Sequence, residues 1–253
     1  MKNKIVVITG GATGIGLAIA RELLSDNTVI SLDRNPTKIA ALRSALPHVH
    51  SINADVTLAD HRHAALASIE KEFGRIDLLI NDAGIGGTFN FLKADEDTLQ
   101  RAIANEIAVN YEAPILLTKL ALPLLKKSND PTVVVTTTGL VYTPMAIIGS
   151  YCASKAAAHF AAMSLRHLLA PEKIRVVEVL PPSVDSELNF AKGVKKMPPE
   201  IFAKQFLAKL SRGQEVINVG QSVFLEKLSR LAPKMAFRML NSRSGTPPGR
   251  SAD

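Results

Sequence analysis

Tyr151 and Lys155, two ionisable side chains with helical spacing, are the clearest candidates for chemistry in this sequence. Residues four apart on an α-helix lie one turn apart on the same face. A phenol with a pKa of about 10 is a poor acid–base catalyst near neutrality, but an ammonium group held beside it favours the phenolate and lowers that pKa. The pair is therefore suited to exchanging a proton with an alcohol or a carbonyl. Because the same spacing also arises by chance on amphipathic helices, this interpretation depends on the rest of the chain.

A glycine-rich segment, Thr9-Gly10-Gly11-Ala12-Thr13-Gly14-Ile15-Gly16, indicates a nucleotide-binding turn. Its backbone N–H groups and the positive end of the following helix would face a pyrophosphate. Gly10, Gly14 and Gly16 would provide the tight turn and the close approach that a side chain blocks. The segment follows a predicted strand, opens a predicted helix and precedes an acidic residue at the end of the next strand, which favours dinucleotide binding over a plain strand–helix turn.

Three charged residues near this turn bear on the choice of dinucleotide. Asp33 ends the second predicted strand, where a carboxylate binds the adenosine ribose hydroxyls and repels a 2′-phosphate. Arg34 follows directly and would instead face a 2′-phosphate. We therefore expect NAD as the cofactor and keep NADP as the alternative. Asp55 would bond the adenine amino group, or else be an ordinary helix-capping or loop acid.

These residues are placed by an alternation of strands and helices. Strands are expected at 4–9, 28–33, 49–53, 76–80, 132–137, 174–180 and 215–219, and helices at 14–25, 36–46, 58–73, 95–127 and 150–170. The alternation predicts an α/β protein with a doubly wound Rossmann fold, whose mostly parallel seven-stranded sheet carries helices on both faces. Residues 1–220 would form this NAD(P)-binding domain, with a lid over the site at about 183–213. Residues 221–253 would form a basic, amphipathic extension with a flexible end.

Composition narrows the class of protein. The chain has 253 residues, 47% of them hydrophobic, and no apolar run approaches the roughly 20 residues that span a bilayer. The single cysteine, Cys152, excludes an internal disulfide and fits a reducing compartment, so we expect a cytoplasmic protein in which Cys152 is a packed thiol. The pairs His48/His50 and His61/His63 lack the cysteine or carboxylate partners of a zinc site, and no metal is expected.

The net charge of +7 is concentrated at the C-terminal end. Residues 1–191 carry 18 Lys and Arg against 19 Asp and Glu, whereas residues 192–253 carry 12 against 4. This region has no aromatic-rich surface or motif for nucleic acid, so none is expected as a partner. Residues 221–241 interleave apolar and basic residues around Pro233, which predicts two short helices. They would dock on their own domain or on a neighbouring subunit; weak attachment to an anionic membrane surface is the alternative.

Taken together, the motifs resemble those of the short-chain dehydrogenase/reductase family. The resemblance runs from about residue 4 to residue 219 and is carried by Thr9-Gly-x-x-x-Gly14-x-Gly16, Asn81-Asp82-Ala83-Gly84, Asn110, Thr138 and Tyr151-x-x-x-Lys155. The loop at 180–184 and the last quarter of the chain are similar to the branch of this family named for D-alanylation of teichoic acids. No substrate is carried over from that branch name.

The resemblance implies a role for each matching residue. Tyr151 would be the general acid/base, and Lys155 would lower its pKa while binding the nicotinamide ribose. Thr138 would hydrogen-bond the carbonyl oxygen, and Asn110 would hold a water in the proton relay. The implied cofactor-binding residues are Gly10, Thr13, Gly14, Ile15, Gly16, Asp33, Arg34, Asp55, Val56, Asn81, Ala83, Gly84, Tyr151, Lys155, Pro182, Val184 and Ser186.

Three residues depart from the family pattern. Asp82 replaces the second Asn of the fourth-strand motif, and Ser183 replaces a Gly after the sixth strand. Thr138 occupies the position of the catalytic Ser; its hydroxyl donates the same hydrogen bond, but its methyl group restricts χ1 and takes up space. The Thr138 and Ser183 departures motivate an alternative to catalysis, in which the protein binds NAD(P) as a weakly active or inactive sensor or scaffold.

The expected reaction is reversible hydride transfer between nicotinamide and a secondary alcohol or its carbonyl, as in a short-chain alcohol dehydrogenase or carbonyl reductase. An epimerisation or dehydration through a transient ketone is a further alternative. The family positions of the substrate pocket are mostly apolar here, which favours a hydrophobic small molecule: Leu140, Pro144, Ile148, Val184, Leu188 and Phe190. Family members pair through the helices at about 104–127 and 150–170, so a homodimer or homotetramer is expected.

Overall fold

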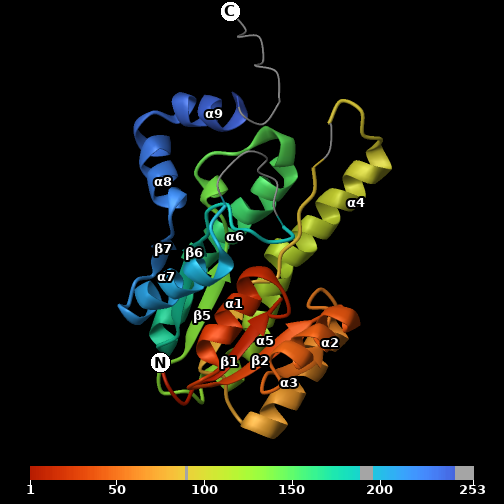
Figure 1. The fold of residues 1–253 in the computed structure, drawn as a ribbon, viewed down its shortest axis with the longest axis vertical. Helices are drawn as coiled ribbons and strands as arrows, with labels where there is room; N and C mark the ends of the chain where they lie inside the picture. Colours follow the sequence, from red (N-terminus) through yellow and green to blue (C-terminus); the bar gives the residue numbers. More distant parts are fainter. Residues whose placement is uncertain (89–90, 189–195, 243–253) are drawn as a thin grey trace, which may run out of the picture.

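A parallel β-sheet with seven strands in the order β3-β2-β1-β4-β5-β6-β7 forms the centre of the computed structural model (Figure 1). The structure describes residues 1–88, 91–188 and 196–242. The strands are β1 (Ile5–Thr9), β2 (Thr28–Asp33), β3 (His50–Asn53), β4 (Leu78–Asn81), β5 (Thr132–Thr136), β6 (Arg175–Leu180) and β7 (Val216–Asn218). The sheet confirms the predicted doubly wound α/β fold, since strand order reverses between β1 and β4 and every pairing is parallel.

Helices cover both faces of the sheet. They are α1 (Gly14–Leu23), α2 (Pro36–Ala45), α3 (Ala59–Phe73), α4 (Glu96–Ile107), α5 (Ala113–Leu125), α6 (Gly149–Leu169), α7 (Pro199–Ser211), α8 (Gln221–Leu231) and α9 (Pro233–Ser242). Shorter turns are η1 (Ala108–Glu112), η2 (Gly139–Val141), η3 (Ala146–Ile148) and η4 (Ala170–Glu172). Side chains of α1, α2 and α7 fill the core on one face, and those of α3 and α5 fill the core on the other.

The helical stretch expected at 95–127 is not one uniform helix. Between α4 and α5 the backbone forms a π-helical turn, η1, which contains Asn110. Such turns are rare and frequently lie at functional sites. Pro114 follows in the first turn of α5, where a missing N–H group costs least. The irregular turn therefore directs Asn110 into the interior, where it is 1% exposed.

The prediction of a lid at 183–213 is wrong over its second half, because α7 (Pro199–Ser211) is a helix of the hydrophobic core. Phe202, Phe206 and Leu210 recur at intervals of four residues and are buried between α7, α1 and the sheet. A helix that buries these side chains in the core is stabilised by the hydrophobic effect, and a mobile lid that exposed them would lose that stabilisation. Residues 183–188 lie near the predicted site and 196–197 are tied to them, whereas 189–195 lie outside the described residues.

The last two helices pack on the domain through one side and expose the other. Leu225 and Ala236 are buried, whereas Phe224, Leu231 and Met235 are 58%, 86% and 56% exposed. Asn241 on α9 accepts a hydrogen bond from Ala146 N (2.7 Å) and donates to Pro144 O (3.1 Å). The predicted break at Pro233 is confirmed, since α8 ends at Leu231 and α9 begins at Pro233. The two Asn241 hydrogen bonds attach α9 to the loop that precedes Tyr151. The expected flexible end, 243–253, lies outside the described residues.

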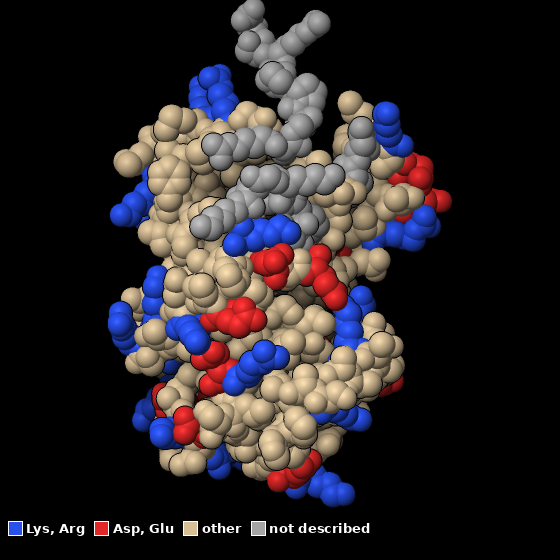
Figure 2. All heavy atoms as spheres, in the orientation of Figure 1, with Lys and Arg blue, Asp and Glu red and all other residues tan. Residues whose placement is uncertain are grey.

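Charge is mixed on the face of the molecule that Figure 2 shows. On the face shown in Figure 2, Lys and Arg side chains alternate with Asp and Glu and do not form one continuous basic surface. No helix among residues 1–88, 91–188 and 196–242 has the length and apolarity to cross a membrane. In the same part of the chain, no group of three or more His, Cys, Asp or Glu side chains has a metal-binding arrangement.

Candidate active site

The glycine-rich turn between β1 and α1 has the geometry of a phosphate cradle. Gly10 and Gly14 have φ of +75° and +56°, a backbone region that side chains disfavour. A Cβ on Gly16 would lie 2.3 Å from the carbonyl oxygen of Gly10, so α1 starts in direct contact with the turn. Thr13 and Ile15 flank Gly14 at the helix N-terminus. The turn therefore fits a dinucleotide pyrophosphate, because backbone N–H groups are accessible where larger residues would block the approach.

Thr9 joins this turn to the end of β4. Its hydroxyl oxygen accepts hydrogen bonds from the backbone N–H groups of Asp82 and Ala83, both at 3.0 Å. A Cβ on Gly10 would lie 3.1 Å from the Cα of Ala83. The structure thus brings the turn and the 81–84 segment together, as the parallel order of β1 and β4 requires.

Asn81 and Gly84 lie at opposite ends of that segment. The Asn81 side chain donates to Thr118 Oγ1 (3.3 Å) and Val134 O (3.4 Å), so it ties β4 to α5 and β5. A Cβ on Gly84 would lie 3.3 Å from Asn110 Oδ1 and 3.4 Å from Lys155 Nζ. Gly84 therefore keeps open the space beside the predicted catalytic residues.

Asp33 lies beside the glycine-rich turn at the end of β2. Its carboxylate accepts hydrogen bonds from Ala12 N (3.1 Å) and from the Ser31 hydroxyl. Burial raises its pKa, and the Ser31 bond partly offsets this. The carboxylate is thus held against the turn, where an adenosine ribose would lie in a bound dinucleotide.

Arg34 and Asp55 form an ion pair of 3.4 Å over the same end of the sheet. Asp55 also accepts hydrogen bonds from the backbone N (2.9 Å) and hydroxyl (2.7 Å) of Thr57. Burial of Asp55 opposes its ionisation, but the Thr57 bonds and Arg34 outweigh it and lower the pKa. Val56 is buried beside them. The Thr57 bonds are those of a loop-ordering acid, the alternative interpretation of Asp55.

The segment after β6 lies over the glycine-rich turn. The Cβ of Ser186 would be 3.2 Å from a Cβ placed on Gly14. Val184 pairs with Met197 in a short parallel bridge, and Pro182 packs against Gly220. Glu187 forms an ion pair with Lys38 of α2 and so spans the site between the two halves of the sheet. The structure therefore brings Ser186 to the glycine-rich turn, whereas the contacts of Pro182 and Val184 are with Gly220 and Met197.

Tyr151, Lys155 and Thr138 meet at the carboxyl end of β5. Tyr151 and Lys155 lie on one face of α6 and are 7% and 3% exposed. Thr138, two residues beyond β5, hydrogen-bonds to Tyr151 through its side chain. Lys155 Nζ donates to the carbonyl oxygen of Thr136 (2.7 Å). The structure therefore brings together the two hydroxyls and the ammonium group that the sequence singled out.

The expected lowering of the Tyr151 pKa is not found in this structure. Burial raises the pKa of Tyr151 above its usual value, and the hydrogen bond with Thr138 offsets only part of the effect. Lys155 directs its ammonium group to Thr136, and burial lowers its own pKa to about 8. Desolvation of both groups therefore outweighs the attraction that the helical spacing predicted.

Asp82 adds a third ionisable group. Burial raises its pKa to about 6, although Thr136, Lys155 and the N–H of Gly16 lie beside it and oppose the shift. Its Oδ1 atom is buried without a hydrogen-bond partner in the described structure. The Asn-to-Asp departure therefore places a carboxyl group next to Lys155, whose charged form it favours.

Asn110 is held by its side chain. Its amide donates to Ile85 O (2.8 Å) and to Ser154 Oγ (2.9 Å), and its Oδ1 accepts from Ile85 N (2.9 Å). Both side-chain groups are therefore engaged. A relay water would bind the second lone pair of Oδ1 or the main-chain carbonyl of this residue.

An apolar wall stands beside Tyr151. Ile148, Tyr151 and Cys152 form a buried cluster, against which Leu140, Met145, Ile147 and Leu188 pack. Pro144 is exposed nearby, and Phe190 lies outside the described residues. Burial raises the pKa of the Cys152 thiol to about 11, so it is a packed thiol and not a reactive one.

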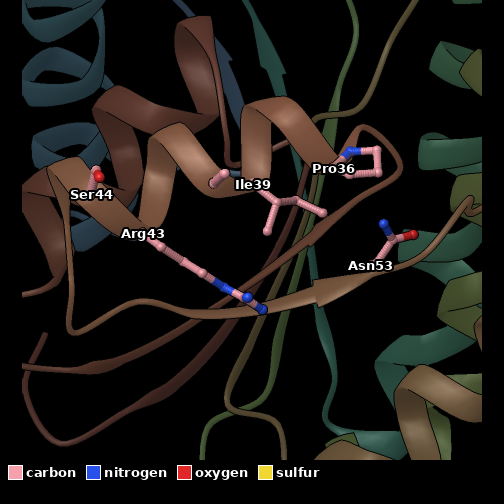
Figure 3. A pocket seen from close by; sticks show the side chains of 6 residues that line it. Pro36, Ile39, Arg43, Ser44 and Asn53 are labelled. Atoms are coloured by element: carbon pink, nitrogen blue, oxygen red, sulfur yellow. The ribbon is translucent and has the colours of Figure 1, made fainter.

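A shallow hollow of about 490 Å³ lies elsewhere, between α2 and β3. Figure 3 shows Pro36 and Ile39 on one side of it, Asn53 on the other, and the Arg43 side chain reaching across. The Arg43 guanidinium donates to Ser51 O (3.0 Å). None of the catalytic candidates lines this hollow.

Sequence reasoning missed several residues that organise the site. Ser31 and Ser154 orient Asp33 and Asn110, and Ser222 of α8 donates to Pro181 O (2.9 Å) beside Gly139. The bonds of Ser154 and Ser222 join residues far apart in the chain, so no local pattern signals them. Ser31 lies two residues before Asp33 on the same strand, and Thr9 ends β1, so these two positions were the available local signals.

Comparison with known proteins agrees with this geometry. Residues 4–196 match the family model described as short chain dehydrogenase. An uncharacterized oxidoreductase of Bacillus subtilis, DltE, is 33% identical over 96% of this chain and 98% of its own. The 2-(S)-hydroxypropyl-CoM dehydrogenase 3 of Xanthobacter autotrophicus is 32% identical over 74% of this chain and 73% of its own.

Among solved structures, a short chain dehydrogenase from Burkholderia cenocepacia in complex with NADP superimposes with a TM-score of 0.82 and 25% identity, covering 97% of this chain and 99% of that one. A 3-ketoacyl-(acyl-carrier-protein) reductase from Brucella melitensis, complexed with NADH, shares the fold with a TM-score of 0.78, covering 87% and 99% of the two chains. Given its motifs, fold and near full-length relatives, the chain belongs to the short-chain dehydrogenase family and is an oxidoreductase that uses a nicotinamide dinucleotide.

Proposed function

We propose that the protein transfers a hydride between the nicotinamide and a secondary alcohol or carbonyl of a hydrophobic small molecule. The observation that carries this proposal is the hydrogen-bonded pair of hydroxyls, Thr138 and Tyr151, beside the buried ammonium group of Lys155. Two convergent hydroxyl donors polarise a carbonyl oxygen, and a phenol also delivers a proton.

When bound, the nicotinamide supplies the hydride in reduction and accepts it in oxidation. In reduction, Thr138 and Tyr151 donate hydrogen bonds to the carbonyl oxygen, and Tyr151 gives up its proton to form the alcohol. Lys155 then stabilises the phenolate until a proton returns through a water held at Asn110. Tyr151 is protonated near neutrality, as reduction requires, but its raised pKa opposes release of the proton, so the ammonium group of Lys155 has to stabilise the phenolate as it forms.

For the cofactor, Asp33 supports a preference for NAD. Its carboxylate stands against the glycine-rich turn and would repel a 2′-phosphate, while the charge of Arg34 is already paired with Asp55. Relatives with NADP and NADH bound show that the fold itself accepts both.

The substrate proposal rests on the apolar wall. Ile148, Leu140 and Leu188 pack at Tyr151. The buried carboxyl group of Glu106 lies close enough to contribute to the raised pKa of Tyr151, so the surroundings are largely but not wholly apolar. A hydrophobic ketone or alcohol would bury apolar area there, which a sugar would not.

The test uses NADH oxidation with phenanthrenequinone, a hydrophobic dicarbonyl. We expect Tyr151→Phe to lose at least 100-fold in kcat and to keep its cofactor affinity, and Thr138→Val to lose 10-fold or more while Thr138→Ser retains activity. Wild-type rates in Tyr151→Phe would exclude it as the proton donor. Tight cofactor binding with no turnover over a panel of carbonyls and alcohols would favour the sensor or scaffold.

We also propose a cytoplasmic homodimer or homotetramer built from residues 104–127 and 150–170. Leu116 of α5 and Phe160 and Met163 of α6 are 44%, 66% and 47% exposed on these helices. A second copy would bury them. Light scattering on Phe160→Asp tests this, since retention of the wild-type mass would place the interface elsewhere.

A further inference from the structure

A buried carboxylate lies behind the catalytic candidates. Glu178, in the centre of β6, is 0% exposed. His159 lies on α6, two helical turns beyond Tyr151 on the same face, and its Nδ1 is 2.9 Å from both carboxylate oxygens. An ionised carboxylate is costly to bury unless it is paired and hydrogen-bonded. The mechanism described above uses neither residue.

The pair is connected to Thr138 through its neighbour. Thr137 donates from Oγ1 to Glu178 Oε1 (2.5 Å), and its backbone N donates to Val179 O (2.9 Å). Thr137 is thereby fixed to β6 by both its side chain and its main chain. Because Thr138 follows directly, the direction of its Oγ1 depends on how Thr137 is held.

Other contacts fix the residues that follow Thr137; we call the segment 137–140 the corner after β5. Thr138 Oγ1 accepts from Leu140 N (3.3 Å), and Gly139 N donates to Pro181 O (3.3 Å). A Cβ on Gly139 would lie 2.5 Å from Ser222 Oγ, so there is no room for this corner to shift towards α8. Thr138 is therefore held between these contacts on one side and Thr137 on the other, and the Glu178–His159 pair acts on the Thr137 side.

The charge of His159 is set by a small group of neighbours. Its hydrogen bond with Glu178 raises its pKa, while burial and Arg166 on α6 act in the opposite direction. The Tyr142 ring lies edge-on at 6.4 Å, and its hydroxyl contacts Asn218, which also bonds Glu226 of α8. Arg230 pairs with Glu226 and completes the charged groups on that side. Below this raised pKa, the protonated imidazole compensates the buried carboxylate.

We propose that Glu178 and His159 are positioning residues for the reaction: together they hold Thr137 and so orient the Thr138 hydroxyl towards the carbonyl oxygen. This inference rests on the proposed role of Thr138. Since His159 has a raised pKa, the paired form is complete at low pH and is lost as pH rises through that value. Turnover should decline over the same range.

The first experiment needs no substrate. The full-length protein is labelled with ¹⁵N-threonine, and the Thr137 and Thr138 amide resonances are followed against pH with saturating NAD. We expect them to titrate together with the His159 ring in wild type. They should stay flat over that range in His159→Gln, which keeps an N–H donor but cannot carry charge. His167→Gln, an exposed histidine on the same helix, is the matched control and should behave as wild type.

The second experiment measures kcat with phenanthrenequinone and NADH from pH 5 to pH 9. We expect His159→Gln, Glu178→Gln and Thr137→Val each to lose about 10-fold in kcat, with cofactor affinity unchanged within twofold, because small misplacements of a catalytic group are costly. The decline of kcat attributed to His159 should be absent in His159→Gln. If Glu178→Gln fails to fold, His159→Gln and Thr137→Val decide.

Flat Thr138 resonances in wild type, or wild-type kcat and pH profile in His159→Gln and Thr137→Val, would overturn the inference. If Tyr151→Phe or Thr138→Val retained full activity, the proposed function would fail instead. In that case the resonance titration would still show whether His159 controls the corner.

Discussion

Replacing Gly16 with alanine tests the dinucleotide cradle most directly. The added Cβ would lie 2.3 Å from the Gly10 carbonyl oxygen and 2.9 Å from its carbon. These are backbone atoms of a turn with positive φ, so they cannot move aside as a flexible side chain would. Alanine gains about 0.5–1 kcal/mol over glycine from helix propensity. Overpacking costs about 1–3 kcal/mol and disrupts the turn, so the clash outweighs the gain.

Gly149→Ala is the matched control, because this glycine also lies in the first turn of a helix and a Cβ there would meet nothing within 4 Å. Thermal unfolding should show Gly16→Ala lower than Gly149→Ala, by about 2–4 °C for each kcal/mol in a domain of this size. NAD titration should show at least 10-fold weaker binding in Gly16→Ala alone. If Gly16→Ala kept wild-type stability and NAD affinity, the argument for a close contact between α1 and the turn would be refuted.

Three further predictions concern charge. Thermal scans should show a shift with NAD larger than with NADP, and Asp33→Ala should reduce the NAD shift and raise the NADP shift; equal shifts in wild type would contradict the role of Asp33. Burial raises the pKa of Asp82 to about 6, so its stabilising contribution is complete below its unfolded value near 4 and is lost as pH rises through 6. Asp82→Asn should therefore gain stability relative to wild type between pH 4 and pH 7, on the order of 1 kcal/mol given partial exposure; a difference independent of pH would refute this. If α8 and α9 bind a membrane surface, the fraction of protein that sediments with anionic vesicles should be lower for the double variant Leu231→Ser/Lys234→Glu than for wild type. Equal and negligible sedimentation of the two proteins would exclude that alternative.

The fold was predictable because its signals are local. Apolar β-branched runs, the glycine-rich turn and the acid at the end of β2 are each contained in short segments, and their order along the chain predicts a parallel sheet with helices on both faces. The prediction of a lid was wrong over α7, although Phe202, Phe206 and Leu210 follow a helical pattern in the sequence. A helical pattern of apolar residues alone does not predict which part of the protein the helix will pack against.

The sequence named the candidate site residues, but it did not predict their electrostatics. The sequence by itself identified the Tyr151/Lys155 pair and the glycine-rich turn, since each depends on residue type and spacing. The resemblance to the short-chain dehydrogenase/reductase family added the Thr138 hydroxyl. Only the tertiary structure decided that Lys155 donates to Thr136 and that burial raises the Tyr151 pKa. It alone placed Glu178 and His159 behind Thr137. Desolvation depends on every element packed around a group, and those elements come from distant parts of the chain, so spacing cannot encode it.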